Sequence, residues 1–175
     1  MSKPIISQMS VSLADKIDGI NKWIGKAISA VILVTVAATV IEVIARYLFN
    51  APTTWAYEVE MFTCGILYVF VGAYVLLHNG HVGVDMVYNR LSPKWQLRMN
   101  LIVTYPLILI MTLVLVYIGW DFAWTSFVMA ERSYTSWAPL LWPIKISLPI
   151  GSALMVLQVI SKIIRDVNQL KGSSQ

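Results

Sequence analysis

Long apolar runs separated by short polar segments dominate the pattern along the chain. Each of the four runs contains 20 or more residues, and a helix needs about 20 to cross the hydrocarbon of a bilayer. Because lipid offers the backbone no hydrogen-bond partners, we expect these runs to be helical. The pattern predicts an all-α integral membrane protein with four transmembrane helices, at residues 23–49, 55–77, 101–120 and 139–160.

The polar remainder of the chain is too short to fold by itself. Composition supports the membrane assignment, since 58% of the residues are hydrophobic and 13% are charged, unlike an ordinary soluble domain. None of the remaining segments is long enough to bury a core of its own. We therefore predict one membrane domain, 1–175, with segments outside the spans at 1–22, 78–100, 121–138 and 161–175.

Basic residues predict the orientation of the spans. Lysines and arginines precede the first run, occupy the loop between the second and third, and follow the fourth. The other two loops contain only one basic residue, Arg132. By the positive-inside rule, both termini and the loop 78–100 should be cytoplasmic, an N-in/C-in topology. The net charge of +4 therefore suits lipid headgroups, and we expect no nucleic-acid partner.

The N-terminal segment 1–22 has the pattern of an amphipathic interfacial helix. Ser12 and Asp15 resemble a capping box, and apolar residues follow at helical spacing. We expect this helix to lie on the inner leaflet before the chain enters the membrane. The apolar positions are Leu13, Ile17, Ile20 and Ile24.

The pattern of the middle loop, which should be cytoplasmic, predicts a second amphipathic helix. Val84, Val87 and Leu91 recur at roughly helical spacing, and Ser92-Pro93 is a helix start signal. A solvated linker is the alternative for this segment.

Besides Lys26, which opens the first run, five charged side chains lie inside the predicted spans. A charge at mid-bilayer costs a few kcal/mol, so each needs a partner or a route to water. Counted along the helices at about 1.5 Å per residue, all five lie in the outer third of the bilayer. They are Glu42, Arg46, Glu58, Glu60 and Lys145.

The spacing of these charges predicts which of them pair. Glu42 and Arg46 are four residues apart and can form an ion pair along one helix. Glu58 shares a face with Gly65 and Gly72, whereas Glu60 lies about 200° further round. We predict that Arg46 and Lys145 neutralise some of the three glutamates, and that Glu60 faces a partner protein.

Two interpretations of the charges remain open: an ion network that fixes helix packing or a subunit interface, and a transport site. The inner half of the predicted bundle contains threonines and a serine but no ionisable side chain. A conducting path should have polar groups across the whole depth of the membrane. We therefore expect that this chain alone conducts nothing.

The chain offers little that would hold a cofactor or catalyse a reaction. Cys64 is the single cysteine, which excludes an internal disulfide and a cysteine metal cluster. His78 and His81 could suggest haem, but both lie at one helix end, whereas axial ligands approach opposite haem faces. We expect no cofactor, no metal and no enzymatic activity. The aromatic loop 121–138 is either an interfacial belt or a docking site for a periplasmic protein.

Several segments stand out together by their order and spacing along the chain. They contain Glu42, Arg46, Tyr47, Asn50, Pro52, Trp55 and Glu58, then Gly72, Ala73, His81, Asp85 and the Leu91-Ser92-Pro93 segment. Together with the four-span plan, these segments resemble the small permease subunit (DctQ family) of tripartite ATP-independent periplasmic (TRAP) transporters, over about residues 15–165.

The resemblance implies a supporting role in a larger complex. Small subunits of this family bind a large permease subunit, and a periplasmic binding protein delivers the substrate, usually a carboxylate. The implied function is to scaffold the large subunit and help dock the binding protein, for sodium-coupled import of organic acids across a bacterial inner membrane. Asn50, Trp55, His81 and Asp85 would have structural or interfacial roles. The alternatives are an independent small transporter or channel, and a membrane anchor for a redox complex.

Overall fold

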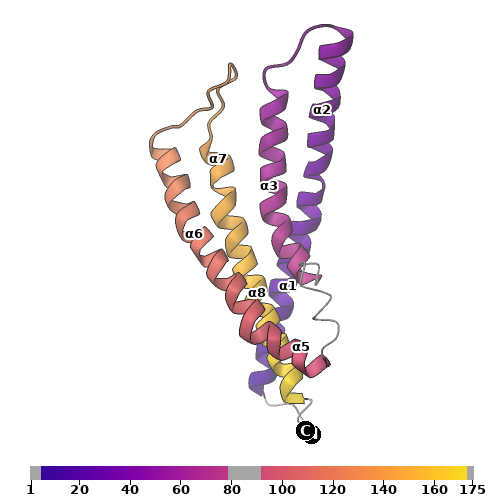
Figure 1. Cartoon of the computed structure of the whole chain (residues 1–175), viewed down its shortest axis with the longest axis vertical. Helices are drawn as coiled ribbons and strands as arrows, with labels where there is room; N and C mark the ends of the chain where they lie inside the picture. The colour runs from indigo at the N-terminus through magenta and orange to yellow at the C-terminus, as the bar shows by residue number, and fades with distance from the viewer. Residues whose placement is uncertain (1–4, 79–91, 173–175) are drawn as a thin grey trace.

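The structure, a computed structural model, describes residues 5–78 and 92–172 as a bundle of long helices (Figure 1). No strand occurs among these residues, apart from one isolated bridge between Arg132 and Leu140. A π-helical turn at Asn100–Thr104 joins α5 to α6. The helices are α1 (Ile5–Ser29), α2 (Val31–Leu48), α3 (Ala56–Leu77), α5 (Pro93–Met99), α6 (Tyr105–Val128), α7 (Trp142–Lys145) and α8 (Ser147–Gly172).

These helices form four segments that are long and apolar enough to span a membrane, as the sequence predicts. They are Val11–Leu48, Ala56–Leu77, Lys94–Val128 and Trp142–Leu170. The segments run up and down, so that the start of α1, α5 and the end of α8 lie at one end (Figure 1). The loops 49–55 and 129–141 lie at the other, which we call the loop end. The all-α, four-span fold is therefore confirmed.

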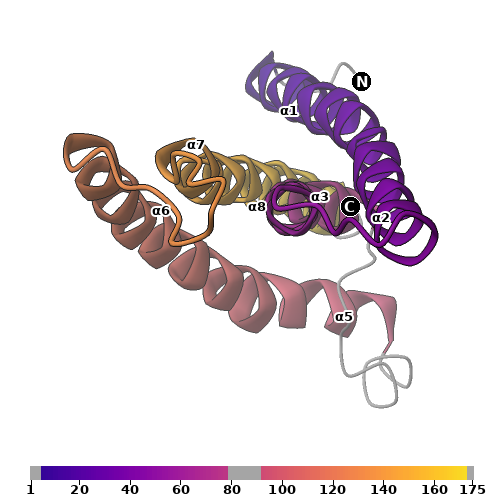
Figure 2. The ribbon, with the colours of Figure 1, turned by 90° about the horizontal axis from the view of Figure 1, so that it is seen from above.

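Helix α8 is the central element of the bundle. It packs against α1, α3 and α6, whereas α2 packs mainly on α3 at the edge of the bundle (Figure 2). In the apolar stretch of Trp142–Leu170, 39% of the residues are buried, against 6% for Val11–Leu48. The outer faces of α2 and α6 consequently remain free for lipid or another protein.

Small residues allow the helices to approach closely where they cross α3 and α8. A Cβ atom on Gly151 would overlap the side chain of Val69 and come within 3.2 Å of its carbonyl group. A Cβ on Gly25 would likewise overlap the ring of Tyr74. At the crossing of α6 and α8, Gly119 lies against Pro149. Such small-residue contacts are typical of helix packing within membranes.

The first helix differs from the sequence-based expectation. It begins at Ile5, so Ser12 lies inside the helix and the predicted capping box at Ser12 and Asp15 is wrong. The helix breaks at Ala30, where α2 takes over. It also packs along α3 and α8, because its polar side chains bond to α8.

Other boundaries also differ modestly. Helix α6 continues to Val128, eight residues past the predicted end of the third span at 120. Ser92 and Pro93 begin α5, as their helix start signal predicts. The proposed amphipathic positions Val84, Val87 and Leu91 lie outside the described residues.

Candidate functional site

Glu42 and Arg46 form the ion pair that their spacing predicts, near the loop end of α2. Arg46 donates from Nε and Nη2 to Glu42 Oε1 at 2.9 and 2.6 Å. The other carboxylate oxygen accepts hydrogen bonds from the backbone N–H of Thr53, at 2.9 Å, and from its hydroxyl. Asn50, one of the family-matching positions, adopts a left-handed φ of 50° in the turn that connects α2 to Thr53. Glu42 therefore fixes this turn against the end of α2.

Glu58 is buried between α3 and the loop 129–141. Its side chain is 1% exposed, and the hydroxyl of Thr135 donates to Oε1 at 2.6 Å. Oε2 has no hydrogen-bond partner among the described residues. The face that Glu58 shares with Gly65 and Gly72 does pack inward, since those glycines lie against Ile144 of α7 and Met155 of α8. Glu58 thus belongs to the interior of this chain.

Lys145 pairs with a carboxylate that the sequence analysis did not include. Its ammonium group contacts Glu131, in the loop after α6, so the predicted pairing of Lys145 with Glu42, Glu58 or Glu60 is wrong. Lys145 ends α7, which packs against α6, and the extension of α6 brings Glu131 close. The ammonium also lies 3.9 Å from the ring centroid of Phe122. The hydrogen bond from Lys145 holds the pKa of the Glu131 carboxyl below its usual range.

Glu60 is half-buried, and within residues 5–78 and 92–172 its carboxylate forms no ion pair. Trp55, another family-matching position, is the N-cap of α3, and its carbonyl accepts the N–H of Val59. Two further matching positions, His81 and Asp85, lie outside the described residues.

The sequence analysis missed a polar network between α1 and α8. It lies nearer the end of the bundle that holds the start of α1, α5 and the end of α8, which we call the terminal end. Asp18 is the centre of the network: Oδ1 accepts from Gln158 at 2.9 Å and from Ser161 at 2.6 Å, and Oδ2 accepts from Arg165 at 2.6 Å. Asn21 donates to Gln158 at 2.6 Å. Asn21, Gln158 and Ser161 are each at most 2% exposed. We call these five residues the α1–α8 polar network.

The charged members of this network, Asp18 and Arg165, lie just outside the predicted spans 23–49 and 139–160, so the absence of ionisable groups from the inner half of the spans stays a prediction. Gln158 was the available signal, since an amide inside a span needs a polar partner. The partner was hidden because Asp18 is 140 residues away along the chain. Buried polar groups that are hydrogen-bonded to each other hold a unique packing, so the network fixes α1 against α8.

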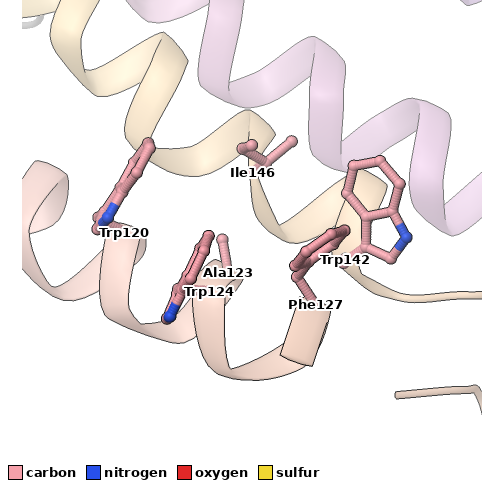
Figure 3. A pocket seen from close by; sticks show the side chains of 6 residues that line it. All are labelled: Trp120, Ala123, Trp124, Phe127, Trp142 and Ile146. Atoms are coloured by element: carbon pink, nitrogen blue, oxygen red, sulfur yellow. The ribbon is translucent and has the colours of Figure 1, made fainter. Parts of the chain in front are cut away.

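An aromatic cavity of about 210 Å³ opens near the loop end, between α6 and the start of the fourth span (Figure 3). The rings of Phe127 and Trp142 meet edge to face, with centroids 5.4 Å apart. The lining of the cavity is almost wholly apolar and consists of Trp120, Ala123, Trp124, Phe127, Trp142 and Ile146. No group of three His, Cys, Asp or Glu side chains that could hold a metal ion occurs in the described part of the chain.

No curated protein matches this sequence. A family model does match: it describes the DctQ component of tripartite ATP-independent periplasmic transporters and covers residues 35–169. With four membrane-spanning helices and this match over most of its length, the chain belongs to the DctQ family of TRAP transporter components.

Proposed function

We propose that this chain is the small membrane subunit that braces the large permease subunit of a TRAP transporter in a bacterial inner membrane. In this role it helps a periplasmic binding protein to dock, and the complex imports organic acids together with sodium. Substrate and sodium would bind to the large subunit, and this chain would supply a fixed frame for it. The family membership supports the transporter role.

The main observation that supports the proposal is the exposure of the outer faces of α2 and α6. Ala38 is the one buried residue of α2, while Leu33 and Leu48 are more than two-thirds exposed. The buried residues of α6 form one narrow stripe, at Tyr105, Thr112, Gly119, Ala123 and Ser126. Wide apolar surfaces on both sides of a small bundle can accommodate a large membrane partner as well as lipid.

Polar contacts of the charged side chains support a bracing role. Glu42 bonds to Arg46 and Thr53, Asp18 bonds to residues of α8, and one carboxylate oxygen of Glu58 accepts from Thr135. Charges that are bonded within one chain fix its packing, whereas a transported ion needs partners that can exchange. Glu60, with no ion pair among the described residues, is our proposed polar contact with the large subunit.

Co-purification and reconstitution test the proposal together. A tagged copy expressed together with a large TRAP permease subunit should retain that multi-span protein in detergent. Liposomes that contain both subunits should accumulate substrate when sodium and the binding protein are supplied, and liposomes with this chain alone should not. Uptake by this chain alone would instead favour an independent transporter, and a haem absorption band would favour a redox anchor.

A further inference from the structure

The loop between α6 and α7 is folded into a compact hairpin. The backbone N–H of Ser133 donates to Pro139 O, and that of Leu141 donates to Glu131 O, both at 2.9 Å. Within it, Ala138 N–H donates to Thr135 O at 3.1 Å, and Arg132 Nη1 donates to Ala138 O at 3.0 Å. Residues 131–141, here called the outer hairpin, therefore hold a defined shape.

Two alanines in and beside this hairpin adopt a backbone conformation that alanine rarely takes. Ala130 has φ 45° and Ala138 has φ 47°, in the left-handed region that disfavours residues with a Cβ. Such conformations persist where surrounding contacts over-determine them, and they are frequent at binding sites. The shape of the hairpin is thus enforced at both ends.

Two contacts with the membrane spans tie the outer hairpin down. Thr135 donates to the buried Glu58 at the start of α3, and Glu131 pairs with Lys145 at the end of α7. Each tie uses a charged side chain that would be costly to leave unpaired in a span. The hairpin is therefore positioned by two different helices.

The fixed hairpin presents an aromatic and basic surface. Tyr134 is fully exposed at its tip, and Arg132 and Trp137 are exposed beside it. Arg132 forms no ion pair within the described parts of the chain. Tyrosine, tryptophan and arginine are the residue types that most often dominate the affinity of protein interfaces.

The position of the hairpin favours a water-soluble partner over lipid. Trp120 and Trp124 of α6 line the aromatic cavity. Tryptophans gather at the depth of the lipid headgroups, so we expect this part of α6 at the membrane–water interface. Helix α6 runs on from Trp124 to Val128, about 6 Å further at the rise of a helix. The hairpin begins only after that, and it rises above the end of α6 (Figure 1).

We propose that the outer hairpin is the element of this subunit that docks the periplasmic binding protein, with Tyr134 as the anchor. The inference rests on the proposed function, because it takes the binding protein as the soluble partner. The matching surface would be a shallow pocket for the phenol ring, with a carboxylate at its rim for Arg132. A rigid hairpin loses little conformational freedom when it binds, which favours affinity.

Affinity measurements on the assembled transporter test this assignment. Purified complexes in lipid nanodiscs carry Tyr134→Ala or Arg132→Ala, and the dissociation constant of the purified binding protein is measured on each. Tyr134→Ala should weaken binding about 30-fold, as expected for an interface hot spot. Tyr57→Ala is the matched control, since Tyr57 is also strongly exposed near the loop end, in the first turn of α3.

A protection experiment locates the contact without removing the anchor. Ser136→Cys is introduced together with Cys64→Ala, which removes the single native cysteine. A charged, membrane-impermeant maleimide should label the exposed position 136 rapidly, and saturating binding protein should slow labelling at least tenfold. Labelling that is slow in nanodiscs but fast in detergent would show that the hairpin lies in lipid, and would overturn the proposal.

Failure of the hairpin assignment and failure of the proposed function give different results in these experiments. If the large subunit co-purifies and uptake requires the binding protein, the proposed function stands. Unchanged affinity in both Tyr134→Ala and Arg132→Ala, with no protection at position 136, would then refute the hairpin assignment alone. If the large subunit fails to co-purify with the unaltered chain, the proposed function itself is refuted.

Discussion

Three charged side chains in the spans have partners in the loops just outside them. Glu42 bonds to Thr53, Glu58 to Thr135, and Lys145 to Glu131. Each of these partners lies in one of the two loops at the loop end. The cost of a charge in the membrane is thus offset by contacts that also order the loops.

Arg46→Leu should lower the yield of the assembled complex modestly. The substitution removes the cation beside Glu42, but both Thr53 hydrogen bonds remain. Arg46 lies on the outer side of the bundle, and Glu42 keeps two of its hydrogen bonds without it. We expect about a twofold loss of co-purified large subunit, measured against an internal standard. The double variant with Thr53→Val should lose more, and an unchanged yield in that variant would count against the Glu42 cluster.

The Glu131–Lys145 pair should make stability depend on pH in the acid range. The pKa of Glu131 is lowered from 4.5 because Lys145 donates a hydrogen bond to it. Its contribution is complete above the ordinary pKa and is lost as the pH falls through the lower folded value. Thermal unfolding from pH 7 to pH 3 should therefore show the gap between the unaltered chain and Glu131→Gln closing at low pH. A gap independent of pH would exclude this role for the pair.

At the scale of helices, the close contact of α3 with α8 depends on Gly151. Gly151→Ala places a Cβ against the side chain of Val69 and 3.2 Å from its carbonyl. Because backbone atoms cannot move aside easily, we expect a loss of about 1–3 kcal/mol in unfolding free energy. Denaturant titration of the purified chain in detergent measures the loss.

The control for this substitution is Gly19→Ala in α1. No atom lies within 4 Å of a Cβ built on Gly19, and alanine favours a helix more than glycine does. This variant should be as stable as the unaltered chain or slightly more so. Equal losses in the two variants would mean that the α3–α8 contact is looser than the structure has it.

Helices and short-range contacts were predictable from the sequence, whereas contacts between distant helices were not. Run length alone identifies four spans, and a spacing of four predicts the Glu42–Arg46 pair. The partners of Lys145 and Gln158 depend instead on how α6 meets α7 and how α1 meets α8. These partners cannot be predicted from periodicity. Periodicity places a residue on one face of its helix, but it does not say which helix packs against that face.

At the scale of the whole molecule, Glu58 and Glu60 should contribute differently to assembly. Neither forms an ion pair among the described residues, but Glu58 is 1% exposed and accepts a hydrogen bond from Thr135, whereas Glu60 is only half-buried. Glu60→Gln should weaken association with the large subunit about tenfold, the loss expected for a charged hydrogen bond. Glu58→Gln should do less, because the glutamine oxygen can still accept from Thr135.

The comparison requires both variants to fold equally well. Association is measured by titrating labelled large subunit into nanodiscs, after matched unfolding curves have been recorded. Equal effects, or a larger effect of Glu58→Gln at unchanged stability, would place the subunit contact elsewhere on the bundle.

The orientation of the whole bundle in the membrane remains a prediction of the basic residues, and two positions at opposite ends can decide it. Lys16 is exposed on α1 near the terminal end, and Ser136 is exposed in the outer hairpin. With Cys64→Ala in place, Ser136→Cys should react with an impermeant maleimide on intact spheroplasts, and Lys16→Cys only after lysis. The reason is that lysines and arginines cluster at the terminal end, and such residues are retained in the cytoplasm. The reverse pattern would place the outer hairpin in the cytoplasm, where no periplasmic protein could reach it.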